Sequence, residues 1–243
     1  MPLYRDVGVV VRTHKLGETD RIVTVVTQDS GRVRAVAKGV RKPGSRFGSR
    51  LEPLSHVQLQ LYRGRDLDVV NQVELVEVSS GIRSNLEATT DAMAMCEMVD
   101  HLSQDRAPAP HLYRMLVGAL RQLNNAYGPL VLAALQLRLL EVEGVGPRVD
   151  GCVRCGSSES LVAFDVSEGG VQCIDHRRGG TMSPPAIAVL QRILGGDVAG
   201  TLRRTDHGES TVREVVVVAR TLMERHLERR LRASSLFEAP PPN

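Results

Sequence analysis

The sequence predicts a multidomain β + α protein, in which a small five-stranded barrel precedes an all-helical domain that carries a cysteine-rich insertion. Three observations lead to this prediction. Residues 1–80 contain short β-branched segments separated by turn signals, the apolar residues after Gly81 recur at helical spacing, and three of the four cysteines lie between Cys152 and Cys173. The chain has 243 residues, of which 42% are hydrophobic and 24% charged, as is ordinary for a globular protein with a sizeable core.

The amino-terminal barrel is predicted from five short segments. They are rich in β-branched residues or alternate with period two, and the third alternates basic residues with Val and Ala. The predicted strands are 7–11, 22–27, 31–37, 56–62 and 67–70. Five strands joined by short turns fit an oligonucleotide/oligosaccharide-binding (OB) barrel. The pattern alone fits a small barrel of the SH3 type about equally well.

The helical part is predicted from capping signals and from proline and glycine at helix ends. Two stretches have the form of a capping box, in which a hydroxyl and a Glu three residues later satisfy early backbone N–H groups: Ser84–Glu87 and Thr211–Glu214. Other signals predict helices that begin near Pro110, Gly128-Pro129 and Ser183-Pro184, with ends at Gly144 and Leu194 for the last two. Residues 145–180, rich in Cys and Gly, are expected to be irregular.

The clustered cysteines predict a metal site. Cys152 and Cys155 form a C-x2-C-G turn, and Cys173 and His176 form a C-x2-H turn further along the chain. Two such turns supply four ligands suited to one tetrahedral Zn²⁺, and because they fill its coordination shell the ion is expected to be structural. The alternatives are a redox C-x-x-C, incidental buried cysteines and a degenerate site that has lost its metal. Cys96 lies on an apolar helical face and is interpreted as a small buried hydrophobe.

Four arginines close to these ligands in sequence have two possible roles. They could offset the net negative charge of Zn²⁺ bound to three thiolates, or they could face nucleic acid: Arg148, Arg154, Arg177 and Arg178. With the metal site, the predicted domains are an OB barrel at 1–80, a helical domain at 81–151 and 177–243, and a zinc-binding module at 152–176.

A run of positive charge predicts nucleic-acid binding by the barrel. No acidic residue lies between Asp29 and Glu52, and such a run would repel itself without an anionic partner. The predicted DNA-binding residues are Arg32, Arg34, Lys38, Arg41, Lys42, Arg46 and Arg50. Phe47 is the one ring in this segment that could stack on a base, and aromatics are only 3% of the chain. We therefore expect binding by charge, with little preference for base sequence.

Other function classes find little support. The chain has no phosphate-binding loop, no G-x-G-x-x-G after a strand and no G-x-S-x-G, so we predict that it is not an enzyme. The carboxylates Glu18, Asp20 and Asp29 lie near turns and are interpreted as structural. No apolar run reaches the roughly 18–20 residues that span a bilayer, and Met1–Asp6 lacks the form of a signal peptide. We expect a cytoplasmic protein without a membrane partner.

Three segments resemble the bacterial RecO recombination-mediator family, in particular its actinobacterial branch. They are Gly17–Val23 running into Gly31–Arg41, then Leu139–Pro147, then the turn Cys152–Gly156, and they occur in that order over most of the chain. His176 stands where family members that keep zinc often have a fourth cysteine.

The resemblance implies a fold and a set of partners. It implies an OB barrel, a helical domain and a zinc module in a DNA repair and recombination protein associated with the nucleoid. It also implies binding to single- and double-stranded DNA, annealing of complementary strands, and partnership with RecR and single-strand DNA-binding protein to load RecA at gaps. Arg121 and Arg138 are candidates for contacting the acidic tail of single-strand DNA-binding protein. The alternatives are an RNA-binding assembly factor with an OB fold and a zinc ribbon, a zinc-dependent nucleic-acid enzyme, and a scaffold for an acidic protein.

Overall fold

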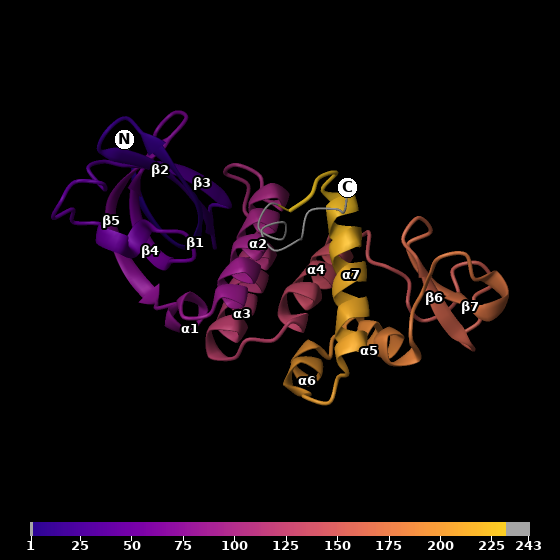
Figure 1. The fold of residues 1–243 in the computed structure, drawn as a ribbon. Coiled ribbons are helices and arrows are strands. Elements are labelled where there is room, and N and C mark those ends of the chain that lie inside the picture. The colour runs from indigo at the N-terminus through magenta and orange to yellow at the C-terminus, as the bar shows by residue number, and fades with distance from the viewer. Residues whose placement is uncertain (1, 232–243) are drawn as a thin grey trace, which may run out of the picture. The chain divides into compact units, whose positions relative to one another are not determined.

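A computed structural model describes residues 2–231 (Figure 1). The chain forms two compact units, one that holds the residues up to Tyr127 and one that holds Gly128–Arg230. We describe each unit by itself. No helix among the described residues is both long enough and apolar enough to cross a membrane.

The first unit begins with a closed five-stranded barrel. Its strands are β1 (Leu3–Leu16), β2 (Asp20–Thr27), β3 (Arg32–Ala37), β4 (His56–Tyr62) and β5 (Asp68–Glu77), in the order β1-β2-β3-β5-β4 around the barrel. All neighbours pair antiparallel except β3 and β5, which pair parallel. The predicted OB-type barrel is therefore confirmed, and β1 and β5 run longer than the sequence pattern indicated.

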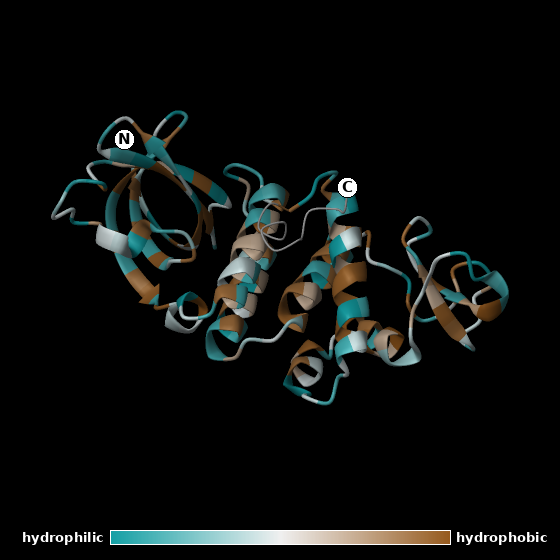
Figure 2. Cartoon of the chain, viewed as in Figure 1, coloured by the Kyte–Doolittle hydropathy of each residue, from teal (hydrophilic) through white to brown (hydrophobic). Residues whose placement is uncertain are grey.

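Alternation along the strands builds the barrel core. In β3, Val33, Ala35 and Ala37 point inward and are buried, whereas Arg34 between them is exposed. Figure 2 shows hydrophobic and hydrophilic residues interleaved along the barrel strands. The segment between β3 and β4 closes one side of this core through η1 (Gly48–Leu51), with Phe47 and Leu51 almost fully buried.

Three helices complete the first unit: α1 (Ser80–Arg83), α2 (Leu86–Leu102) and α3 (Pro110–Asn125). The capping box at Ser84 was a wrong prediction. The cap of α2 is Asn85, whose side chain accepts from the N–H of Ala88, and Ser84 instead ends α1. Ser84 donates its hydroxyl to the carbonyl of Gly81, and the cap lies at Asn85 because that residue has the extended backbone of a cap, whereas the backbone of Ser84 is helical.

The α2–α3 connection lies directly against the barrel. The N–H of Arg32 donates to Gln104, and the N–H of Arg106 donates back to the carbonyl of Arg32. A Cβ atom on Gly31 would stand 2.0 Å from the carbonyl oxygen of Ala107. Only glycine allows this approach, so the β2–β3 turn is fitted to the helical connection.

The second unit is built on four helices: α4 (Leu130–Val142), α5 (Pro184–Leu194), α6 (Val198–Arg203) and α7 (Glu209–His226). The predicted start of α5 at Ser183 and its end at Leu194 are confirmed: the Ser183 side chain accepts from the N–H of Ala186, and Gly195 follows the last helical residue. The second capping box was a wrong prediction: α7 begins at Glu209, two residues before Thr211, and Glu214 accepts from the N–H of Ser183. α6 was not predicted.

A small sheet holds the cysteine-rich part of the second unit. It contains β6 (Leu161–Asp165), β7 (Gly170–Cys173) and β8 (Gly180–Thr181), in the order β7-β6-β8, and the short helix η2 (Ile174–His176) follows β7. The expectation that 145–180 is irregular was therefore wrong. The strands are too short for a period to be recognised in the sequence, and they bury Ala163, Phe164 and Val171 among glycine-rich turns.

Candidate functional site

The second unit brings the four predicted metal ligands together. The ligand atoms of Cys152, Cys155, Cys173 and His176 all lie within 4.8 Å of one another. The sulfurs of Cys155 and Cys173 are 3.8 Å apart, and the Cys173 sulfur lies 3.3 Å from Nδ1 of His176. Two thiolates at about 2.3 Å from a tetrahedral ion stand about 3.8 Å apart, so this cluster could hold a metal ion.

Local backbone geometry explains why the first turn presents two sulfurs. The N–H of Gly156 donates to the carbonyl of Cys152, and the N–H of Cys152 donates to Ser157, both at 2.8 Å. Gly156 has φ of +78°, a left-handed conformation that glycine adopts without strain. The second turn leaves β7 at Cys173 and enters η2, which places His176 beside the cysteine.

The turn also favours a thiolate at Cys152. Burial raises the pKa of this thiol, but N–H groups of Cys173, Cys155 and Arg154 donate to the sulfur and lower the pKa to about 6. The N–H of Ser157 lowers the pKa of Cys155, yet desolvation and the neighbouring thiols outweigh it and leave that pKa raised. One sulfur of the cluster is thus prepared to bind a cation at neutral pH.

The four arginines near the cluster divide into two kinds. Arg154 pairs with Glu168, with Nε 3.1 Å from the carboxylate, and Glu168 also accepts from the buried Gln172. The positive charge of Arg154 is therefore neutralised within the module. The side chains of the other three are exposed: Arg148, Arg177 and Arg178.

In the first unit, six of the seven predicted DNA-binding cations are exposed on the barrel. They lie on β3 and on the segment that follows it: Arg34, Lys38, Arg41, Lys42, Arg46 and Arg50. None of the six forms an ion pair among the described residues. Their positive charge is therefore available to an anion.

The start of this segment is fixed to the β1–β2 turn. The carboxylate of Asp20 accepts from the N–H of Gly39 at 2.8 Å, and this bond and a second from Thr19 hold the pKa of Asp20 below its usual value. The guanidinium of Arg41 donates to the carbonyl of Glu18 at 2.8 Å. Asp20 thus has the structural role predicted for it. It also orders part of the surface formed by the six exposed cations, which we call the cationic surface.

Arg32 differs from the prediction. Its guanidinium lies 2.6 Å from the carboxylate of Asp105 and donates to the carbonyl of Asp100, whose buried carboxylate lies 3.4 Å away. Arg12 approaches the same Asp100 carboxylate at 3.0 Å. Acidic partners in the helical connection compensate Arg32, and the sequence hid them because they lie about 70 residues further along the chain. We therefore leave Arg32 out of the cationic surface.

Phe47 also differs from the prediction. Its ring is 1% exposed and belongs to the barrel core, so it cannot stack on a base from solvent. The guanidinium of Arg46 lies over it, 4.9 Å from the ring centroid. The ring therefore supports a cation of the surface from beneath.

The sequence interpretation missed other exposed cations of the barrel, among them three in or near two of its turns. Arg63 and Arg65 lie in the β4–β5 turn, and Lys15 lies near the end of β1. In OB barrels the turns between strands 1 and 2 and between strands 4 and 5 border the binding face. The signal is present in the sequence as two arginines in Arg63-Gly64-Arg65-Asp66, between the predicted strands 56–62 and 67–70.

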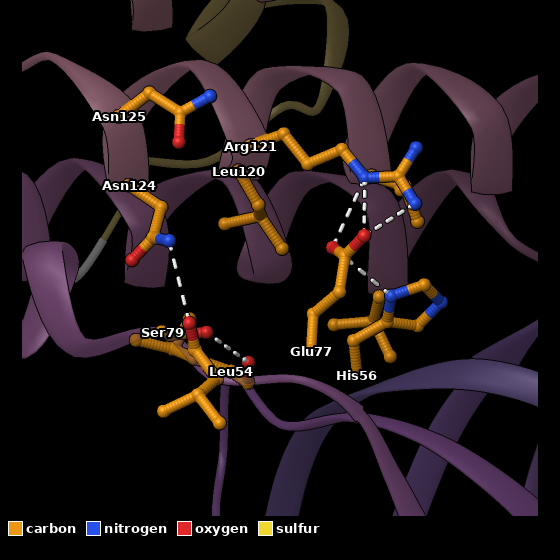
Figure 3. Close-up of a pocket in the computed structure, with 11 residues that line it drawn as sticks. Leu54, His56, Glu77, Ser79, Leu120, Arg121, Asn124 and Asn125 are labelled. Atoms are coloured by element: carbon orange, nitrogen blue, oxygen red, sulfur yellow. Dashed lines mark hydrogen bonds and ion pairs between the residues drawn. The ribbon is translucent and has the colours of Figure 1, made fainter.

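A cavity of about 280 Å³ in the first unit contains Arg121 (Figure 3). Arg121 donates to both carboxylate oxygens of Glu77, at 2.8 and 3.0 Å, and Nδ1 of His56 lies 3.4 Å from the same carboxylate. Nε2 of His56 lies 2.9 Å from the Tyr113 hydroxyl. These polar groups bond to one another and join the end of β5 to α3. We call this contact the seam.

The fold and the two sites define a class of protein: an OB-barrel protein with an exposed cationic surface, a helical part and a Cys3His module of the kind that holds a structural ion. Comparison with known sequences is more specific. Residues 1–79 match the family described as Recombination protein O N terminal, and residues 83–235 match Recombination protein O C terminal. The chain belongs to the RecO family of DNA repair and recombination proteins.

Two relatives align over nearly the whole chain. The DNA repair protein RecO of Cutibacterium acnes is 43% identical over 98% of this chain and 100% of its own length. The DNA repair protein RecO of Frankia casuarinae is 44% identical over 98% of this chain and 99% of its own length. These names describe repair proteins and state no enzymatic reaction, in agreement with the prediction for this chain.

Proposed function

We propose that this protein binds single- and double-stranded DNA, anneals complementary strands, and helps to load recombinase at gaps. The observation that carries the proposal is the set of exposed, unpaired cations on the barrel between Arg34 and Arg50. They lie on a fold whose strands and turns commonly bind nucleic acids, in a chain of the RecO family.

Annealing follows from charge alone. Two complementary strands repel each other through their phosphates, and a cationic surface lowers that repulsion while it holds both strands close together. The exposed surface carries no aromatic ring in the segment after β3, so the bases stay free to pair. No nucleotide hydrolysis is required, because each base-pair step of the duplex supplies about 1.4 kcal/mol of stacking.

We propose one structural Zn²⁺ at Cys152, Cys155, Cys173 and His176. Three thiolates and one imidazole are ligands that zinc prefers, and they leave no position for water or substrate. When bound, the ion supplies a cross-link between the two turns. Residues of the chain orient the ligands: Gly156 shapes the first turn, and β7 delivers Cys173 to η2.

The partners are proposed from membership of the family. They are RecR, single-strand DNA-binding protein and, indirectly, RecA, in the cytoplasm at the nucleoid. Arg121 and Arg138 are each paired with a carboxylate of their own unit, Glu77 and Glu141 respectively. Neither offers an unneutralised charge, so we do not place the contact with the acidic tail on them.

The test is the salt dependence of binding to a single-stranded oligonucleotide. With about five phosphate contacts, the logarithm of the binding constant should fall against the logarithm of salt with a slope of about −3.5. The variant Arg41→Ala/Lys42→Ala/Arg46→Ala should bind more weakly, with a slope smaller by about 2. Arg114→Ala removes an exposed cation of α3 and serves as the control. An unchanged affinity and slope in the triple variant would refute the assignment of the surface.

A further inference from the structure

A groove lies beside the cationic surface of the first unit. It encloses about 560 Å³ between residues 46–50, which run into η1, and the outer side of β5. One wall carries Arg46 and Arg50, and the other is formed by Asn71–Leu75. The groove is thus continuous with the proposed phosphate-binding residues, and it has a different chemistry on its far side.

A bulge in β5 shapes the far wall. Gln60 of β4 faces Gln72, whereas the next residue, Leu61, faces Val70, so Asn71 is an extra residue in the strand. Val70 and Val73 both point into the core, and the two amides between them both lie outside it. Bulges re-aim side chains in this way beside functional sites. A regular strand would have turned one of the two amides inward.

The two walls would treat a nucleotide differently. The guanidinium of Arg50 donates to the carbonyl of Arg46 at 2.9 Å, which holds the cationic wall together. The exposed carboxylate of Glu74 on the other wall repels a phosphate. A nucleotide in the groove therefore lies with its phosphate toward the arginines and its base toward β5.

The far wall is suited to a base. Asn71 uses its amide N–H to reach Gln60 at 2.7 Å, which leaves its carbonyl oxygen as an acceptor. Gln72 makes no side-chain hydrogen bond among residues 2–231, and its amide is exposed. Leu75 is 45% exposed and offers an apolar surface at the end of the wall. Amide groups pair with base edges, and an apolar side chain can cover a base plane.

We propose that this groove binds an unpaired base of the DNA strand whose phosphates lie on the cationic surface. The proposal rests on the proposed function and adds a contact that only single-stranded DNA can make, because a base inside a duplex cannot turn into the groove. Pairing with a complementary strand withdraws the base. The protein would therefore hold a single strand more tightly than the duplex that it produces, which favours release after annealing.

The test compares a normal single-stranded oligonucleotide with one of equal length whose sugars carry no bases. Both present the same phosphates. The wild-type protein should bind the normal strand about three- to tenfold more tightly, as expected for one or two hydrogen bonds and a covered base. The variant Gln72→Ala/Leu75→Ala should bind the two strands with nearly equal affinity, so that most of this affinity ratio is lost. It should keep the salt slope, since it removes no cation.

Matched variants separate the possible outcomes. Gln28→Ala truncates another exposed glutamine of the barrel, in the β2–β3 turn, and should keep the ratio; melting temperatures check that each variant is folded. Equal binding of both strands by the wild-type protein, or an unchanged ratio in the groove variant, would overturn the groove proposal and leave the cationic surface intact. Failure to bind either strand at low salt would overturn the proposed function itself, and the groove proposal with it.

Discussion

The barrel and the metal module are both small β structures, but different interactions hold them. The barrel encloses a continuous core that includes Val10, Val25, Leu59 and Leu61. The module at 152–181 has three short strands, buries few large side chains and gathers four ligands from two turns. The comparison teaches that the barrel has a core of its own that needs no ion, whereas we expect the module to have too little core to order its turns alone.

The strongest way to test this contrast is to remove one ligand. Cys155→Ser should lower metal affinity by at least about 100-fold, because a hydroxyl is a poor replacement for a zinc-bound thiolate. Amide hydrogen exchange should then show lost protection in β6 and β7, while the strands of the barrel keep theirs. Metal content measured on the same samples links the two effects.

Cys96 provides the matched control. It is fully buried on α2, burial raises its pKa to about 12, and it lies outside the ligand cluster. Cys96→Ala should keep the full metal content and the protection of β6 and β7. Protection of both strands in the metal-free Cys155→Ser variant would contradict the view that the module depends on its ion.

A second test destabilises the core of the barrel instead. Phe47→Ala removes a ring that fills its core and should lower the free energy of unfolding by about 3–5 kcal/mol. Phe47→Leu keeps most of the volume, and its DNA affinity should stay close to that of the wild type under conditions where both are folded. Denaturant melts and oligonucleotide titrations check the pair. A large loss of affinity in well-folded Phe47→Leu would restore the idea of base stacking.

A third test separates two arginines of β3. Arg32→Ala removes one of the two arginines that pair with the buried Asp100. The free energy of unfolding should fall by about 2–3 kcal/mol. This is less than the loss expected when a fully buried ion pair is broken, because Arg12 still pairs with Asp100. Arg34→Ala, two residues away and exposed, should change stability by less than about 0.5 kcal/mol and weaken DNA binding. Thermal melts and binding assays on both variants suffice. The opposite pattern would reverse the roles assigned to them.

The smallest expected effect concerns pH and the seam of Figure 3. Burial holds the pKa of His56 below its ordinary 6.5, although Glu77 opposes the shift. As pH falls, the unfolded chain takes up this proton first, so stability is lost below pH 6.5 and is full above it. Between pH 6.5 and 5.5 the loss is at most about 1 kcal/mol. The stability of His56→Gln should fall less steeply over this range; parallel curves would rule out His56 as the cause.

The sequence predicted the elements whose signals are local or periodic. Alternation in β3 revealed its outer basic face, and the two short ligand turns revealed the metal cluster, because each signal lies within a few residues. Positions decided by tertiary contacts were not predictable. The acidic partners of Arg32 lie on a distant connection, and Phe47 entered the core because the loop that carries it folds over the barrel.

Short strands and helix caps also could not be predicted from the pattern of residues in the sequence. β8 has two residues and β7 has four, which is too few for alternation to stand out among glycines. Asn85 and Ser84 are both good cap residues, and only the backbone conformation at Asn85, with φ of −128° and ψ of 124°, decides between them.

The bond between Asp20 and Gly39 has a consequence for how this part of the chain can vary in length. It fixes the point where the loop leaves the barrel, and the buried Phe47 fixes the point where it returns. Added residues near Gly44 would lengthen only the free span, and doubling a flexible loop costs only about 0.6 kcal/mol. The loop can therefore grow near Gly44 without disturbing the barrel core, whereas an insertion before Gly39 would break the bond to Asp20 that fixes its start.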